Sequence, residues 1–171
     1  METAITVVIL VGLLLISVVG LAQFSMSAQA TVADSSRLMQ ERVAERSRTS
    51  VAPVSAVTVA PGSSIQVTLK NSGSTKLADF SHWDVILQYS DGVNTQIMWY
   101  PYGTGVNQWT VSGIYQSTSP LVPEVVDPGI FNPGEEMVLT VNVSPSVAAG
   151  TSNSAVIDTP NGITASTVFT Y

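Results

Sequence analysis

Residues 79–84, Asp-Phe-Ser-His-Trp-Asp, bring together side chains that could hold a metal ion. Two carboxylates and one imidazole form a ligand set that transition metals accept. His82 is the single histidine of the chain, and the absence of cysteine excludes thiolate zinc sites, disulfides and cysteine nucleophiles. An ordinary polar loop explains the same six residues, and we predict no metal site and no cofactor.

The remaining acidic residues offer little basis for catalysis. Asp91-Gly92-Val93-Asn94 could supply oxygen ligands to calcium, but this run is typical of a hairpin turn. Glu135 and Glu136 are adjacent at the start of an expected strand, so they point to opposite faces and cannot act as an acid–base pair. A Gly-x-Ser-x-Gly nucleophile motif is absent from the sequence. We predict that the protein is not an enzyme.

One sequence motif predicts a covalent modification. Asn142-Val143-Ser144 is an acceptor sequence for N-glycosylation, although Pro145 after it disfavours the reaction. Asn142 lies in an alternating segment whose pattern points its side chain outward. Asn142 is therefore the predicted glycosylation site.

The charge is sparse and unevenly distributed. Charged residues make up 11% of the 171 residues, against about 25% in an average soluble domain. All 6 basic residues lie between Arg37 and Lys76, and the net charge is −6. Phosphate binding requires clustered lysine and arginine, so the composition excludes nucleic acid as a partner.

The N-terminal segment from Thr3 to Ala22 contains no charge and no proline. About 20 apolar residues suffice for a helix that crosses the hydrocarbon core of a membrane. Three interpretations compete: a cleaved secretory signal, a lasting anchor, or a helix that assembles with copies of itself. The residues before the apolar run, Met1-Glu2-Thr3, are acidic, whereas a cleaved signal requires a basic start.

The helical pattern continues beyond the apolar segment. Residues 23–50 contain neither proline nor glycine, and the acids Glu41 and Glu45 lie one helical turn from arginines. We predict one helix from Thr3 to about Val51, roughly 75 Å long, which Pro53 ends. A membrane anchor does not need this continuation, whereas a bundle of many copies does. An anchor followed by a helical stalk remains the alternative.

From Val54 onward the hydrophobic period changes to two, which indicates strands. Seven or eight short strands alternate with turn residues, and residues 116–133 are expected to form a long, proline-rich loop. The predicted fold class is therefore α+β, a long N-terminal α-helix followed by an immunoglobulin-like antiparallel β-sandwich. We place the assembly helix at 1–52 and the extracellular sandwich at 53–171. Core packing is the expected role of the dense aromatic residues, and a subunit contact is the alternative: Trp83, Trp99, Tyr100, Tyr102 and Trp109.

Two turns carry a family resemblance. The stretch Val67–Leu77 contains Asn71-Ser72-Gly73, and Phe131–Glu135 contains Pro133-Gly134-Glu135. With the helix-then-sandwich architecture, these turns make the chain resemble the archaeal flagellins (archaellins) of the type IV pilin-like superfamily. The resemblance implies a structural subunit of an extracellular helical filament for motility. It also implies a membrane-inserted precursor, a homo-polymer, and an assembly platform with its ATPase.

The same resemblance assigns roles within the first helix. Met1 and Glu2 would take part in N-terminal processing and assembly. In the given sequence no basic leader ending in glycine precedes Met1, and Ile5 stands where bacterial pilins carry a glutamate. Two alternatives stay open: a membrane-anchored archaellum accessory or stator protein, and a non-rotating adhesive pilin. The predicted filament-core positions are Ile5, Val8, Ile9, Gly12, Leu13, Leu15, Ile16 and Val19.

Overall fold

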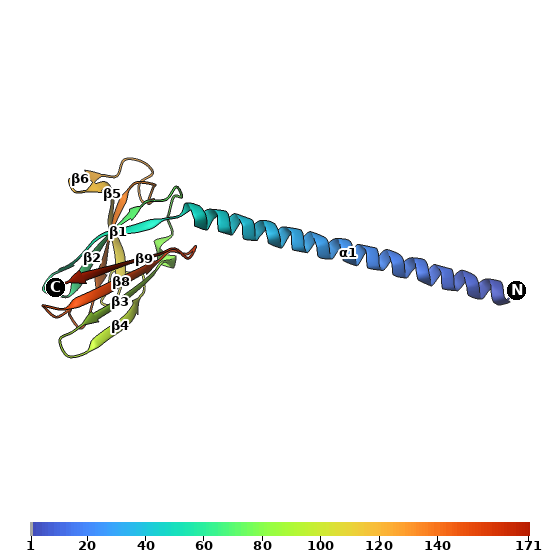
Figure 1. The fold of residues 1–171 in the computed structure, drawn as a ribbon, viewed down its shortest axis with the longest axis horizontal. Helices are drawn as coiled ribbons and strands as arrows, with labels where there is room; N and C mark the ends of the chain where they lie inside the picture. The colour runs from blue at the N-terminus through green and yellow to red at the C-terminus, as the bar shows by residue number, and fades with distance from the viewer. Residues whose placement is uncertain (1) are drawn as a thin grey trace. The chain divides into compact units, whose positions relative to one another are not determined.

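A computed structural model describes residues 2–171 as one long helix and nine strands. The chain divides into two units, residues 1–43 and residues 44–171, so the last turn of the helix belongs with the strands. Figure 1 shows the helix α1 (Glu2–Arg48) and the strands that follow it. Helix α1 ends at Arg48, four residues before the predicted boundary between residues 52 and 53. That boundary stays a prediction.

Helix α1 forms because its 47 residues lack proline and contain only two glycines, Gly12 and Gly20. We predicted that the helix continues to about Val51 and that Pro53 ends it, and the helix instead ends at Arg48, three residues before the predicted end. The amide of Thr49 still donates to the carbonyls of Glu45 and Arg46, and the chain then becomes extended. Pro53 lies within the first strand.

The strands form two antiparallel sheets, which confirms the predicted fold class. The five-stranded sheet has the order β1-β2-β7-β5-β6, and the four-stranded sheet has the order β4-β3-β8-β9. A short 3₁₀ helix, η1 (Phe80–His82), precedes β3. The strands are β1 (Val51–Val59), β2 (Ser64–Asn71), β3 (Asp84–Ser90), β4 (Thr95–Tyr100), β5 (Trp109–Thr118), β6 (Leu121–Pro123), β7 (Glu136–Asn142), β8 (Ser152–Asp158) and β9 (Thr164–Thr170).

Alternate residues of both sheets meet in one core. In β2 the buried apolar side chains are Ile65, Val67 and Leu69, and the register pairs Val67 with Leu139 of β7. The four-stranded sheet contributes Val85, Leu87, Tyr89 and their neighbours. Burying such a side chain contributes about 1.5–3 kcal/mol, so the sandwich is held by this core without disulfides.

The aromatic residues divide between the core and the surface. Trp83, Tyr100 and Trp109 are buried, as expected for core packing. Trp99 and Tyr102 are 55% and 42% exposed. The part of the cluster that the core does not use therefore lies at the surface near β4.

The segment 116–133 is not the continuous loop that we predicted. Strand β5 continues to Thr118, and β6 pairs with it before the loop begins. The Glu136 carboxylate of β7 accepts hydrogen bonds from the backbone amide and the hydroxyl of Thr118, at 2.7 and 2.6 Å. This cross-strand contact extends β5 into a stretch whose serine, threonine and proline residues favour a loop.

Candidate functional site: an uncovered apolar helix and a hydrogen-bonded junction

The first half of α1 has an apolar surface that the rest of the described chain does not cover. The predicted core residues Ile5, Val8 and Ile9 are 62%, 71% and 58% exposed. Leu13, Leu15, Ile16 and Val19 are likewise exposed, and no described atom lies within 4 Å of a Cβ placed on Gly12. The helix is long and apolar enough to cross a membrane.

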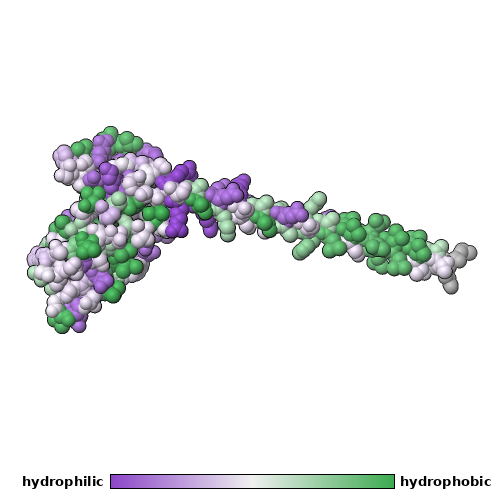
Figure 2. Space-filling model, in the orientation of Figure 1, coloured by the Kyte–Doolittle hydropathy of each residue, from purple (hydrophilic) through white to green (hydrophobic). Residues whose placement is uncertain are grey.

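The apolar surface surrounds this half of the helix. At 3.6 residues per turn, the predicted core positions form one broad stripe. The opposite side carries residues that are just as apolar and just as exposed: Val7, Leu10, Val11, Leu14, Val18 and Leu21. Figure 2 shows the hydrophobic surface of the N-terminal half on the face turned toward the viewer. Such a helix needs lipid or several neighbours around it.

The second half of α1 contains both charged and apolar residues. Figure 2 shows hydrophilic patches on this half of the helix. Its exposed apolar side chains include Phe24, Met39 and Val43. Arg37 and Glu41 form an exposed ion pair at 3.3 Å with i,i+4 spacing, one of the predicted helix pairs. This half therefore tolerates water better than the first half and still offers apolar contacts.

Within the unit formed by residues 44–171, the end of α1 is bound by a turn after β2. The amide of Ser74 donates to the carbonyl of Arg48 at 2.8 Å. The amides of Ser72 and Gly73 donate to the carbonyl of Ser50 at 2.9 and 3.0 Å. Carbonyls at the end of a helix lack partners within the helix, so the amide of Ser74 supplies one for the last helical residue, and the other two amides bind the segment that follows.

Gly73 is required at this contact because of its close approach. A Cβ on Gly73 would lie 2.5 Å from the carbonyl oxygen of Arg48 and 2.5 Å from the amide nitrogen of Ser50. Both are backbone atoms, which cannot rotate away. The predicted Asn-x-Gly turn thus has a specific function in the fold, since it binds the backbone that leaves the helix.

A second turn holds the same segment from the other sheet. Asn161, in the turn between β8 and β9, donates from Nδ2 to the hydroxyl oxygen of Thr49 at 2.7 Å. That hydroxyl donates to the carbonyl of Glu45 at 2.9 Å. The hydroxyl of Thr159 in turn donates to Asn161 Oδ1 at 2.5 Å. Residues 48–50 are therefore fixed by both sheets.

Asn71 connects the two turns that carry the family resemblance. Its fully buried side chain donates to the carbonyls of Thr75 and Phe131, both at 2.8 Å, and accepts from the amide of Gly73. Its backbone bonds Gly134 and Glu135 in the second turn. The sequence identified both turns as motifs, but it gave no indication that they bind each other.

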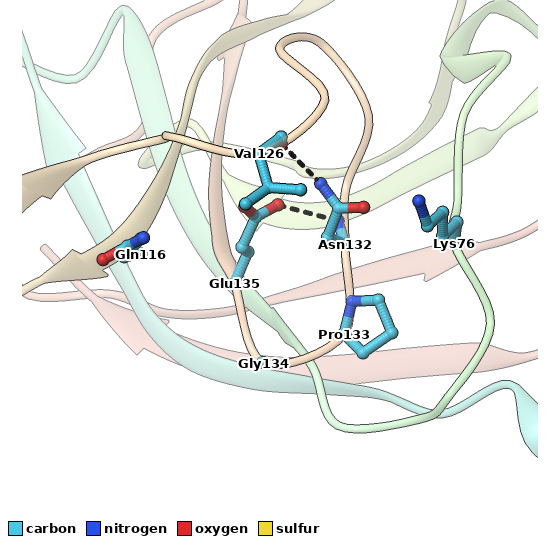
Figure 3. A pocket seen from close by; sticks show the side chains of 7 residues that line it. All are labelled: Lys76, Gln116, Val126, Asn132, Pro133, Gly134 and Glu135. Carbon is cyan, nitrogen blue, oxygen red and sulfur yellow. Dashed lines mark hydrogen bonds between the residues drawn. The ribbon is translucent and has the colours of Figure 1, made fainter.

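A hollow of about 390 Å³ lies beside the second turn. Figure 3 shows Asn132 next to Glu135, with Lys76 on the opposite wall. The Glu135 carboxylate accepts a hydrogen bond from the backbone amide of Asn132 at 2.7 Å. The side-chain Nδ2 of Asn132 donates to the carbonyls of Val126 and Ile130. These side chains are occupied in closing the loop, which is a structural role.

The acidic and histidine residues at 79–84, which we considered as candidate metal ligands and interpreted as a polar loop, have separate partners in the structure. Asp79 and His82 form an exposed pair at 2.8 Å, and hydrogen bonds from His82 and Ser81 lower the pKa of Asp79. Asp84 instead accepts the indole N–H of Trp99 at 2.7 Å. Among residues 2–171 no three histidine, cysteine or acidic side chains gather as a metal site.

The remaining candidates serve turns and strands. Asp91 accepts the amides of Asn94 and Val93, which lowers its pKa to about 2, so its carboxylate stabilises the hairpin turn. Asn142 donates from Nδ2 to the carbonyl of Gly105 at 3.2 Å, and its glycosylation stays a prediction. Met1 lies outside the described residues, and of Glu2 only the helical backbone is described.

Known proteins were compared by sequence and by structure. No family model and no curated protein matches the sequence. Two stator structures from Sulfolobus acidocaldarius are similar in fold. The FlaF–FlaG archaellum periplasmic stator complex matches at TM-score 0.53, 20% identity and coverage of 70% of this chain and 87% of that chain. The FlaG stator protein matches at TM-score 0.51 and 20% identity, covering 71% of this chain and 99% of that one.

A third structure extends the similarity. The archaeal flagellum of Methanospirillum hungatei strain JF1 matches at TM-score 0.54 and 13% identity, covering 92% of this chain and 88% of that chain. At these identities the likeness is one of fold. The resemblance read from the sequence is confirmed at that level, and this chain shares its fold with archaellum proteins.

Proposed function

We propose that this protein is a structural subunit of an extracellular, archaellum-type helical filament, polymerised through its N-terminal helices. The observation that carries the proposal is the apolar surface of α1, which extends around the whole helix over residues 3–22 and is uncovered in the single chain. Copies of the same helix can cover it on all sides.

The length of α1 supports a filament over a simple anchor. A membrane-spanning helix needs about 20 residues, and α1 has 47, or roughly 70 Å. The match to the Methanospirillum flagellum covers 92% of this chain. Residues 44–171 make up only about three quarters of the sequence, so that match includes part of the helix.

The energetics require a membrane stage before assembly. Each buried core side chain contributes about 1.5–3 kcal/mol relative to water. Lipid hides the same side chains, so transfer from membrane to filament gains much less. The precursor would therefore reside in the membrane, with Met1 and Glu2 at its processed end, and an assembly platform and ATPase would supply the energy of extrusion. This structural role involves no catalysis.

An anchored stator-like accessory is the second candidate. The FlaF–FlaG and FlaG stator structures favour it, since both share the sandwich fold. In that case α1 would remain in the membrane and the sandwich would hold the cell-surface layer. Both candidates use the same two parts of the chain, the helix α1 and the sandwich that begins with β1.

The substitution Leu13→Asp tests the polymerisation role. We expect cells that carry it to lose filaments, because a carboxylate in a packed helix bundle has no partner and its burial is costly. The purified variant should keep the thermal unfolding midpoint of the wild-type sandwich. Val106→Asp, at a 72% exposed position of the sandwich, is the matched control and should leave filaments intact. Normal filaments from Leu13→Asp would contradict the proposal.

A further inference from the structure

Strand β4 forms an edge of the four-stranded sheet and pairs only with β3. Figure 1 shows it at the outer margin of the sandwich. Its sequence, Thr-Gln-Ile-Met-Trp-Tyr, contains no charge and no proline, and it pairs with β3 without a register shift. An edge of this kind leaves a row of backbone donors and acceptors open to another strand.

The other three outer strands are protected from such pairing. Strand β1 contains Pro53 and a register shift after it. Strand β6 has only three residues and ends in Pro123. Strand β9 packs against β1. Natural sheets block their edges with prolines, bulges, short strands or covering elements. Among residues 2–171, β4 is the outer strand that lacks all of these.

The hydrogen-bond alternation shows which groups of β4 are free. The amide of Asp91 donates to the carbonyl of Asn94 where the hairpin turn closes. Hydrogen-bonded and non-bonded pairs alternate along an antiparallel ladder. The paired residues of β4 are therefore Gln96, Met98 and Tyr100. The backbone groups that point outward are those of Thr95, Ile97 and Trp99.

The same residues make the sheet surface apolar beside this edge. Ile97 and Trp99 are 67% and 55% exposed, and Ile86 on β3 continues the patch. The indole N–H of Trp99 donates to Asp84 on β3, which holds the ring toward β3 and away from the edge. The outer face of the five-stranded sheet, with Gln66, Lys70 and Thr140, is polar by contrast.

We propose that β4 is a pairing edge for a second copy of this chain, which joins β4 of one copy to β4 of the other in antiparallel fashion. The strand is complementary to itself, because no charge of one copy lies opposite a charge of the other. Such a two-fold contact is isologous, so it closes on itself as a dimer. It rests on the sandwich alone, and because it is two-fold it is separate from the head-to-tail contacts that build a helical filament.

The free groups fix the register. Ile97 of one copy lies opposite Ile97 of the other, and Thr95 lies opposite Trp99, which gives about six backbone hydrogen bonds. A shift in one direction brings Thr95 opposite Pro101, which has no N–H. A shift in the other direction brings Trp99 opposite Val93, whose N–H is bonded to Asp91.

The acidic residues near β4 are too far apart across the contact to oppose this pairing. The nearest acids, Asp84 and Asp91, lie one strand behind β4 or in its turn. Asp84 of one copy and Asp91 of the other are then separated by about three strand spacings, or roughly 14 Å. That separation exceeds the Debye length of about 8 Å at physiological salt. The repulsion between these acids is therefore largely screened, and added salt should change the stability of the dimer little.

Disulfide trapping tests the register in the full chain, purified in detergent micelles. The protein has no cysteine, so Ile97→Cys introduces the single thiol. Opposed residues of a hydrogen-bonded pair have Cα atoms about 5.5 Å apart, within the range of a disulfide. The matched control is Val168→Cys, 69% exposed on β9 of the same sheet. We expect mild oxidation to yield about tenfold more disulfide-linked dimer from Ile97→Cys.

A second variant tests the association itself. Ile97→Lys places a charge on the edge, as natural sheets do, and should abolish the dimer in sedimentation while leaving the unfolding midpoint unchanged. Equal crosslinking of Ile97→Cys and Val168→Cys, or an Ile97→Lys protein that still dimerises, would overturn the proposal. Micelles contain no filaments, so this outcome is independent of the Leu13→Asp test.

Discussion

Asn71 is the residue on which the junction of the sandwich depends most. Its buried amide donates to two carbonyls from different turns and accepts the amide of Gly73. A carboxylate of the same shape could not donate. A smaller side chain would remove the donor to the Thr75 carbonyl and the acceptor of the Gly73 amide, while the Phe131 carbonyl would keep only its bond from the amide of Leu77. The requirement for asparagine therefore follows from the count of donors and acceptors.

The substitution Asn71→Ala should lower the free energy of unfolding of the sandwich by about 2–4 kcal/mol, because buried polar groups lose their partners. Urea unfolding followed by tryptophan fluorescence measures the loss. Gln88→Ala, at an exposed amide of β3, serves as the control and should change little. A loss below about 1 kcal/mol for Asn71→Ala would show that the network is not needed for stability.

Individual residues could be predicted from the sequence only where the signal was local. The turn at Asp91-Gly92 follows from neighbouring residues, and the structure agrees. Glu135 and Glu136 bind different partners, Asn132 and Thr118. The contacts of Asn71 with Phe131 and of Asn161 with Thr49 join residues far apart in the chain. No spacing in a single sequence shows them.

At the scale of elements, two turns determine where α1 ends. Proline at position 53 suggested a later end, but the backbone of residues 48–50 is bound first by the turn after β2 and by Asn161. Strand β5 was likewise longer than its serine-rich and proline-rich sequence suggested, because Glu136 binds its end. Tertiary contacts override local propensity in both places.

The substitution Gly73→Val tests whether the turn after β2 holds the end of α1 through its hydrogen bonds to Arg48 and Ser50. The added side chain would overlap the carbonyl of Arg48 and the amide of Ser50, so the turn must move away. Hydrogen exchange should become about tenfold faster or more at the amides of Ser72 and Ser74, while the core amides of β7 stay protected. Exchange becomes faster because the amides of Ser72 and Ser74 lose their hydrogen bonds to the carbonyls of Ser50 and Arg48.

Gly103→Ala is the control for this experiment, because a Cβ there would meet only the flexible side chain of Gln108. Its exchange should match that of the wild type. Wild-type exchange at Ser72 and Ser74 in Gly73→Val would show that the turn does not hold the segment.

At the scale of the whole molecule, hydrophobicity and charge separate along the chain. The first half of α1 is apolar, all basic residues lie between Arg37 and Lys76, and acids alone follow. The sequence pattern predicted the helix and the sandwich because each has its own hydrophobic period. The pairing of strands into β1-β2-β7-β5-β6 and β4-β3-β8-β9 could not be predicted, since it depends on long-range contacts.

The whole molecule also shows why one fold suits both proposed roles. An uncovered apolar helix and a charge-poor sandwich can be surrounded by identical copies or held in lipid. The two roles differ in what surrounds residues 3–22, so the decisive test must examine the protein in its natural assembly.

The most direct test is electron microscopy of material sheared from the cell surface, with mass spectrometry of its main component. The account predicts thin helical filaments in which this chain is the principal protein. A chain that stays with the membrane fraction, with no filament containing it in quantity, would contradict the filament role and favour the anchored accessory.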